Sequence, residues 1–260
     1  MFIMGSSLFI GNPARSADIV AAMRWSPRVL AVGVALVALV AVAITFQPNR
    51  DERPADPSLT SFYRSEPELL PAGSYVADKV FDGRIAFDVP ASWTSLEHRR
   101  GIAFLLKTVD AQPVWTVDNT VVLGIYAVDR VYEDPCRDRG PATGAPPTLL
   151  GFVAGLTHAV GYEAGPIEET TVGGRPATVF DLRNTIDDDD CRSDHFSQWT
   201  FRTEDGVAAG NGTSTAGTHQ RIWLVDVDGT VLLINADSGD DSYPEDVEEL
   251  YQIINSIRFE

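Results

Sequence analysis

The chain of 260 residues carries 37 acidic and 20 basic residues, a formal net charge of −17 at pH 7. The first 50 residues contain four of the basic residues and one acidic residue, so the remainder is the more acidic part. A surface of this sign repels nucleic acid and anionic lipid head groups, and we expect no nucleic-acid partner.

An uncharged stretch between Arg28 and Arg50 is the most informative segment. Residues 29–46 are almost entirely Val, Ala and Leu, and as a helix they nearly span a ~30 Å hydrocarbon core. The pattern predicts a transmembrane helix over 29–46. The alternative is a cleaved signal peptide, because Ala41-Val42-Ala43 offers small residues to a signal peptidase. Against cleavage, the apolar run exceeds the usual ~7 to 15 residues of a signal peptide.

The charges before this run indicate its orientation. They are Arg15, Asp18, Arg24 and Arg28. Positive charge resists translocation, so residues 1–28 are predicted to be a cytoplasmic tail. The large carboxy-terminal part is then extracytoplasmic, in a single-pass protein of the plasma membrane. A translation start at Met23 in place of Met1 would give the same order of charged and apolar residues.

The exported part begins with residues 47–73, which are rich in Pro, Asp, Glu and Ser and predict a disordered tether. β-strand signals dominate residues 74–260, which we expect to form one domain. Three dipeptides suited to positive φ values predict tight antiparallel hairpins: Asp82-Gly83, Gly173-Gly174 and Asp228-Gly229. The strands flanking them are predicted at 75–81 and 84–89, 167–172 and 175–182, and 222–227 and 230–234. Further strands are predicted at 102–108, 121–132 and 196–202, and residues 206–217 are interpreted as a flexible connection.

Two helices interrupt the strands. The first is predicted to begin after a capping Thr148 and to end at Gly161. Its apolar face contains Leu149, Phe152, Val153, Leu156 and Val160. The second, over 245–257, follows Ser242 and has Pro244 and acidic residues in its first turn. Its apolar stripe contains Val247, Leu250, Tyr251, Ile254 and Ile257. One apolar face on each helix predicts an α+β fold, a largely antiparallel sheet with two packed helices, preceded by one transmembrane helix.

The two cysteines, Cys136 and Cys191, both lie in the region predicted to be exported. In an oxidising compartment we expect them to form a disulfide bond. In the chain-entropy model, closing a loop of this length stabilises the fold by up to ~4 kcal/mol.

Residue types with catalytic or metal-binding chemistry occur without a recognisable pattern. The four histidines are scattered at His98, His158, His195 and His219. None has the spacing of a zinc site, and no serine has the context of a hydrolase nucleophile. We therefore predict no catalytic residue, no cofactor and no metal site, in a protein that is not an enzyme.

Two acidic runs and two tryptophans have structural interpretations. Asp187–Asp190 is interpreted as a solvated loop in preference to a calcium site. Residues 237–241 are interpreted as a turn that leads into the last helix. Trp199 and Trp223 fall in predicted strands, where packing in the core is the expected role.

Several of these segments together resemble one family. They are Asp134-Pro135-Cys136, the helix after Thr148, the turn Val172-Gly173-Gly174, Cys191, Arg221–Gly229 and Ile253–Phe259. The combination resembles a group of uncharacterised actinobacterial membrane-anchored proteins with one exported two-cysteine domain, over Val76–Glu260. In order of elements it also resembles PsbP- and Mog1-like domains, which implies an α/β/α sandwich. Neither resemblance supplies a catalytic residue; the context implies a sensory or interaction domain.

The predicted function is a membrane-anchored extracytoplasmic binding or sensing module without evident catalytic activity. Its partners would be the membrane, through the amino-terminal helix, and a small-molecule or protein ligand. Two alternatives remain open at this point. One is an anchored cell-envelope hydrolase with an unrecognised site, and the other is a purely structural envelope protein.

Overall fold

The computed structural model describes residues 58–64, 66–96, 101–107, 120–135, 139–141, 148–186, 198–203, 206–210 and 218–260. All of these belong to one compact unit, Pro54–Glu260. The predicted cytoplasmic tail, the transmembrane segment 29–46, the run Asp187–Asp190 and both cysteines lie outside the described residues. Within the described ranges, no helix is both long and apolar enough to cross a membrane.

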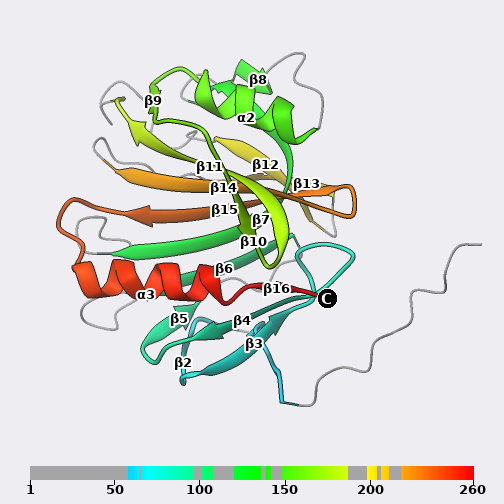
Figure 1. Ribbon diagram of the computed structural model, residues 1–260, viewed down its shortest axis with the longest axis vertical. Coiled ribbons are helices and arrows are strands. Elements are labelled where there is room, and N and C mark those ends of the chain that lie inside the picture. The colour runs from blue at the N-terminus through cyan, green and yellow to red at the C-terminus, as the bar shows by residue number, and fades with distance from the viewer. Residues whose placement is uncertain are drawn as a thin grey trace, which may run out of the picture. The chain divides into compact units, whose positions relative to one another are not determined.

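The described part of the chain folds into two sheets and two helices (Figure 1). The smaller sheet has the order β1-β3-β4-β16, and its strands are β1 (Thr60–Ser61), β3 (Gly73–Ala77), β4 (Ile85–Val89) and β16 (Arg258–Phe259). The larger sheet has the order β10-β11-β14-β15-β7-β6-β5-β2, with β12 and β8 on β7, β13 on β12 and β9 on β11. Every described strand pair in this larger sheet is antiparallel.

The larger sheet is built from strands of very different length. The long ones are β7 (Val121–Asp134), β11 (Arg175–Asn184), β14 (His219–Val227) and β15 (Thr230–Ser238). The others are β2 (Glu68–Leu70), β5 (Trp93–Ser95), β6 (Ile102–Lys107), β8 (Arg139–Pro141), β9 (Tyr162–Ala164), β10 (Glu168–Val172), β12 (Trp199–Thr203) and β13 (Gly206–Gly210). The first half of β7 pairs with β15 and β6, and its second half pairs with β12 and β8.

Both faces of the larger sheet are covered. Helix α3 (Pro244–Asn255) packs on one face, and α2 (Leu149–Thr157) packs on the other. Successive residues of β15 alternate between them: Leu232 and Ile234 join the cluster around α3, and Val231 and Leu233 join the cluster around α2. In Figure 1, β11, β14 and β15 run between α2 (green) and α3 (red). The predicted antiparallel sheet with two packed helices is therefore confirmed.

Helix α3 is held by a compensated charge cluster as well as by apolar packing. The Lys107 Nζ atom lies 2.7 Å from Asp246 Oδ1 and 2.6 Å from Glu249 Oε2. The Trp93 indole N–H also donates to Glu249, at 3.0 Å. Burial on its own would lower the pKa of Lys107, but hydrogen bonds from its ammonium group to the two carboxylates outweigh burial and raise the pKa. The ammonium group therefore stays charged, and it fixes α3 to β6.

Two of the three predicted tight hairpins are confirmed. Gly173 and Gly174 have φ values of 56° and 76° between β10 and β11, and Asp228 and Gly229 have 52° and 87° between β14 and β15. Positive φ at both central residues gives the turn twist that matches antiparallel strands. The prediction at Asp82-Gly83 is wrong: β3 and β4 pair from Ala77 opposite Ile85, so residues 78–84 form a longer loop. Neither residue of this pair has a positive φ.

Helix α2 begins as predicted and ends earlier. The Thr148 side chain accepts a hydrogen bond from the Gly151 N–H at 3.2 Å, which confirms the cap. The helix stops at Thr157, and the Val160 N–H donates to the Glu133 carbonyl of β7 at 2.9 Å. That bond turns the chain away from the helix axis, so Val160 is exposed instead of completing the apolar face.

Part of the predicted tether belongs to the folded domain. Residues 60–61 and 68–70 form β1 and β2, and Phe62 and Leu70 are buried in the core. The strands are too short to show a periodicity in sequence; β2 ends in the buried Leu70, and the buried Phe62 follows β1 directly. Tyr243 occupies the N-cap position of α3 without a side-chain capping hydrogen bond, and the preceding Ser242 has a different role. The Ser242 hydroxyl instead accepts from the Gly239 N–H and donates to the Thr120 carbonyl.

We predict that α3 is required for the fold. Leu250 is 1% exposed in the cluster around α3, so Leu250→Ala should lower the free energy of unfolding by ~2 to 5 kcal/mol. The neighbouring Glu248→Ala, at an exposed position, should change it by no more than ~0.5 kcal/mol. Denaturant titrations of the two variants measure the difference. Equal midpoints would mean that α3 is peripheral.

Candidate functional site

A group of buried polar side chains interrupts the apolar layer under α2. We call this group the polar cluster, and its members are Asn184, Gln198, Thr218, Gln220, Asn235 and Asp237. Most alternate along their strands with residues of the α2 layer: Asn184 follows Phe180 and Leu182, and Asn235 and Asp237 follow Val231 and Leu233. Since side chains alternate between the faces of a sheet, these polar groups point into the layer under α2.

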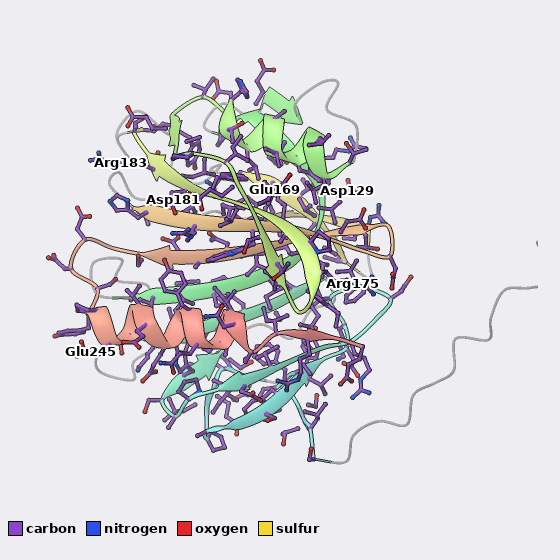
Figure 2. The ribbon with its side chains drawn as sticks, in the orientation of Figure 1. Asp129, Glu169, Arg175, Asp181, Arg183 and Glu245 are labelled. Atoms are coloured by element: carbon purple, nitrogen blue, oxygen red, sulfur yellow. The ribbon has the colours of Figure 1, made fainter. Side chains whose placement is uncertain are left out.

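Strand register gathers the cluster at one end of β11, β14 and β15. Gln220 lies opposite Asp237 on β15 and opposite Leu182 on β11. Beside it, the Asn184 N–H donates to the Thr218 carbonyl at 3.3 Å. The charged residues of β11 lie on the opposite side of the strand: Asp181 and Arg183, labelled in Figure 2, are exposed. The cluster is therefore contiguous and separate from the charged surface of β11.

Gln198 and Gln220 form a reciprocal amide pair. The Gln198 Nε2 atom donates to Gln220 Oε1 at 2.7 Å, and Gln220 Nε2 donates to Gln198 Oε1 at 3.2 Å. Both side chains are at most 2% exposed. The pair connects the residue before β12 to β14. The Gln198 carbonyl also accepts from the Tyr132 N–H of β7, at 2.8 Å.

Asp237 is the one acidic residue of the cluster. Burial raises the pKa of its carboxyl to about 7, although hydrogen bonds from the Gln220 side chain and the Ser238 N–H favour the ionised form. The sequence-based interpretation of residues 237–241 as a turn is wrong at its first residue, because Asp237 is part of β15. The sheet continues beyond the apolar run: Asp237 pairs with Gln220 on one side and with Val122 on the other.

Three buried polar atoms near this layer have no hydrogen-bond partner in the described part of the chain. They are Trp199 Nε1, Thr200 Oγ1 and Asn235 Oδ1. The Trp199 ring packs edge-on against Tyr126, with ring centroids 5.2 Å apart. Tyr126 in turn lies over Gly124, where a Cβ would come within 2.4 Å of the tyrosine ring, and Gly124 is opposite Asn235. Buried polar atoms almost always have a partner, so these positions call for a water molecule or a ligand group.

A second constellation bears on the hydrolase alternative. The His219 Nε2 atom lies 3.3 Å from Asp240 Oδ1, and Ser238 is the cross-strand neighbour of His219. No described hydrogen bond joins Ser238 to His219, and His219 and Asp240 are more than half exposed. A nucleophilic serine needs its base within hydrogen-bond reach, so this arrangement does not support nucleophilic catalysis. In the described ranges, no three His, Cys, Asp or Glu side chains converge as metal ligands.

Other residues singled out in the sequence have structural roles. Trp199 and Trp223 are 0% and 8% exposed, so their packing in the core is confirmed. Residues 206–210 of the predicted connection form β13, which pairs with β12. Gln220, Asn235 and Asp237 lie an even number of residues from buried apolar residues of the same strand, which places them on the same face. This spacing could have revealed the cluster, but only once the lengths of the strands were known.

Comparison with known proteins gives distant structural likenesses. No protein-family model matches the chain, and no curated protein matches it by sequence. A cyanobacterial PsbP from Synechocystis has 11% identity and a TM-score of 0.37, over 76% of this chain and 94% of the other. LpqN, involved in cell envelope biogenesis of Mycobacterium tuberculosis, has 14% identity and a TM-score of 0.30, over 75% and 90%.

A crystal structure from Bacteroides thetaiotaomicron is also similar, with 8% identity and a TM-score of 0.32. The match covers 68% of this chain and 45% of that longer chain. Since all three TM-scores are below 0.5, the function is argued from the residues of the chain itself.

We predict an unusual pH dependence of stability from Asp237. Its pKa in the folded state, about 7, is above the ordinary 3.8, so the folded state binds more protons between these values. Stability from this group is complete below the lower value and is lost as pH rises through the upper one. From pH 5 to pH 8, this group should lower the free energy of unfolding of wild type by about 2 to 3 kcal/mol. Asp237→Asn should not show this decrease.

Denaturant titrations at the two pH values measure this difference. Asp246→Asn is the matched control, because Asp246 is buried beside Lys107 and is compensated. It should lower stability at both pH values without removing the slope. A wild-type slope retained in Asp237→Asn would contradict the assignment.

Proposed function

We propose that the chain is a membrane-anchored extracytoplasmic binding module whose ligand contacts the polar cluster. The observation that carries this proposal is the pair of buried polar atoms without partners on the α2 side of the sheet, Trp199 Nε1 and Asn235 Oδ1. A domain selected for stability alone would place apolar residues there, since a buried polar group without a partner costs about 1 to 3 kcal/mol. A ligand that forms hydrogen bonds with these atoms removes that cost, and the free energy recovered contributes to its affinity.

The chemistry of the site favours a small uncharged polar ligand. Trp199 and Asn235 offer an indole N–H donor and an amide oxygen acceptor, while the Thr200 hydroxyl lies on the other side of β12. None of the three groups can neutralise an anion, and the Asp237 carboxyl together with the net charge of −17 opposes anions further. Amide- or hydroxyl-bearing molecules, such as a short peptide or sugar, supply both donors and acceptors.

We expect Asn235→Leu to separate binding from folding. Leucine has the same branched arrangement of four side-chain heavy atoms and removes the acceptor without a partner, and this gain offsets the cost of fitting its larger methyl groups, so the melting temperature should change little. A thermal-shift screen of the full-length protein in detergent, with cell-wall peptides, sugars and lipids, identifies the ligand. The variant should then lose most of the ligand-induced shift.

Asn255→Leu, the same substitution at an exposed position at the end of α3, is the control and should keep the shift. An undiminished shift in Asn235→Leu would place the ligand elsewhere. No shift with any class of compound would count against the binding function itself.

The proposed location follows from the apolar residues 29–46 and the arginines before them. Protease added to cells without their wall should digest the domain and spare residues 1–28. An exported domain should also yield no free thiol when denatured without reduction, because Cys136 and Cys191 would be joined. Full protection of the domain would refute export, and two labelled cysteines would refute the disulfide.

A further inference from the structure

The Gln198–Gln220 pair, which we call the glutamine clasp, joins two parts of the fold that are not adjacent in the sheet. Gln220 belongs to β14, whereas Gln198 precedes β12, which pairs with the second half of β7. The two amide hydrogen bonds of the clasp are 2.7 Å and 3.2 Å long, and Trp199 and Thr200 follow Gln198 directly in the chain. The clasp therefore joins the residue before β12 to the beginning of β14.

Asp237 lies next to the clasp and shares its Gln220 amide. The carboxyl receives hydrogen bonds from the Gln220 side chain and from the Ser238 N–H. An ionised carboxylate offers about four acceptor positions, so two donors leave it under-satisfied in a buried site. A neutral carboxyl needs fewer donors and no compensating charge. The Gln220 and Ser238 donors favour the ionised form, and burial of the carboxyl, which is 7% exposed under the closed clasp, outweighs them and favours the neutral form.

The elements packed around Asp237 present no described cation to it. On the same face, β14 presents Gln220, β7 presents Val122, β11 presents Leu182 and Asn184, and α2 has no charged residue. His219, Arg221 and Arg183 alternate onto the other face, where His219 contacts Asp240 and Arg221 contacts Asp181.

The remaining described charges near these elements are engaged elsewhere. Lys107 binds Asp246 and Glu249 beside α3. Arg202 of β12 lies 3.5 Å from Asp129, which also contacts Arg130. Within the described part of the chain, an ionised Asp237 has no cation to pair with, so water is the partner that we expect for its charge.

We propose that protonation of Asp237 operates the glutamine clasp. With a neutral carboxyl, the clasp closes the start of β12 over β14. With an ionised carboxylate, water must reach Asp237, the Gln198 side chain is released, and the segment from Gln198 to Thr200 opens. This inference needs only the cluster and stands whether or not a ligand binds there.

Opening of the clasp also changes what the site offers. Trp199 and Thr200 follow Gln198 directly, so their buried polar atoms become accessible when the segment opens. The protein would thus be closed in mild acid and open above neutral pH. A proton becomes the signal that controls access to the buried donors and acceptors.

Amide hydrogen exchange of the full-length protein in detergent tests the proposal. Protection factors, corrected for the intrinsic pH dependence of exchange, are measured at pH 5.5 and pH 8.5 for peptides over 198–203. In wild type they should fall by roughly tenfold to thirtyfold at the higher pH, if the open state has an ordinary carboxyl pKa. Protection of the reference segment 102–107 should stay constant.

Variants assign the effect to Asp237. Asp237→Asn should keep high protection over 198–203 at both pH values, whereas Asp246→Asn should retain the wild-type fall. Gln198→Met, which removes the clasp and keeps the carboxyl, should show low protection at both pH values. A wild-type segment equally protected at both pH values would overturn the proposal, as would an undiminished fall in either Asp237→Asn or Gln198→Met.

Discussion

The larger sheet has a covering layer on each face, and the rest of the structure depends on that constraint. In β15, seven consecutive residues, 231–237, are buried, because alternate positions face α3 and α2. A strand in such a sheet has no solvent-facing side to which a polar residue can be assigned. Every polar side chain in the middle of β14 or β15 therefore needs a partner inside the protein, and Asn235 and Asp237 inherit that requirement from their position.

The two faces meet this requirement in opposite ways. On the α3 face, Asp246 and Glu249 share the Lys107 ammonium group, with N–O distances of 2.7 Å and 2.6 Å. Both carboxylates thus have a cation in contact, and the cluster fastens a helix to a strand. On the α2 face, Asp237 has amide and backbone donors but no described cation. Carboxylates in contact with a lysine have a structural role, whereas burial without a cation raises the pKa of the Asp237 carboxyl to about 7.

The parts of the fold that local chemistry determines could be predicted from the sequence. Gly173-Gly174 and Asp228-Gly229 have the residue types that positive φ requires, and Thr148 has the side chain that caps a helix. Asp82-Gly83 has equally suitable residues, but the loop between β3 and β4 is longer than a tight turn. The residue types of a dipeptide show that it is compatible with a tight turn. Whether a tight turn forms there depends on the register of the two strands.

The polar cluster could not be predicted because it depends on distant pairing. Asp237 belongs to an acidic run, and a run of aspartates after an apolar segment is typical of a turn. It becomes a buried strand residue because β14 and β7 extend beside it and supply Gln220 and Val122 as neighbours. Phe62 and Leu70 were missed for the same reason, since their short strands are held by the core of distant elements.

The position of the cluster explains how one site can serve both recognition and control. Trp199, with its indole N–H lacking a described partner, is the next residue after Gln198, whose amide depends on Gln220 and through it on Asp237. In the proposed mechanism, a change of one proton at Asp237 would reach the Trp199 indole through two side chains and one peptide bond. Replacement of the cluster by apolar residues would stabilise the domain and would remove both properties together. Opening, as proposed, requires low local stability. The cost of the unpaired buried polar atoms is therefore expected at this place in the fold.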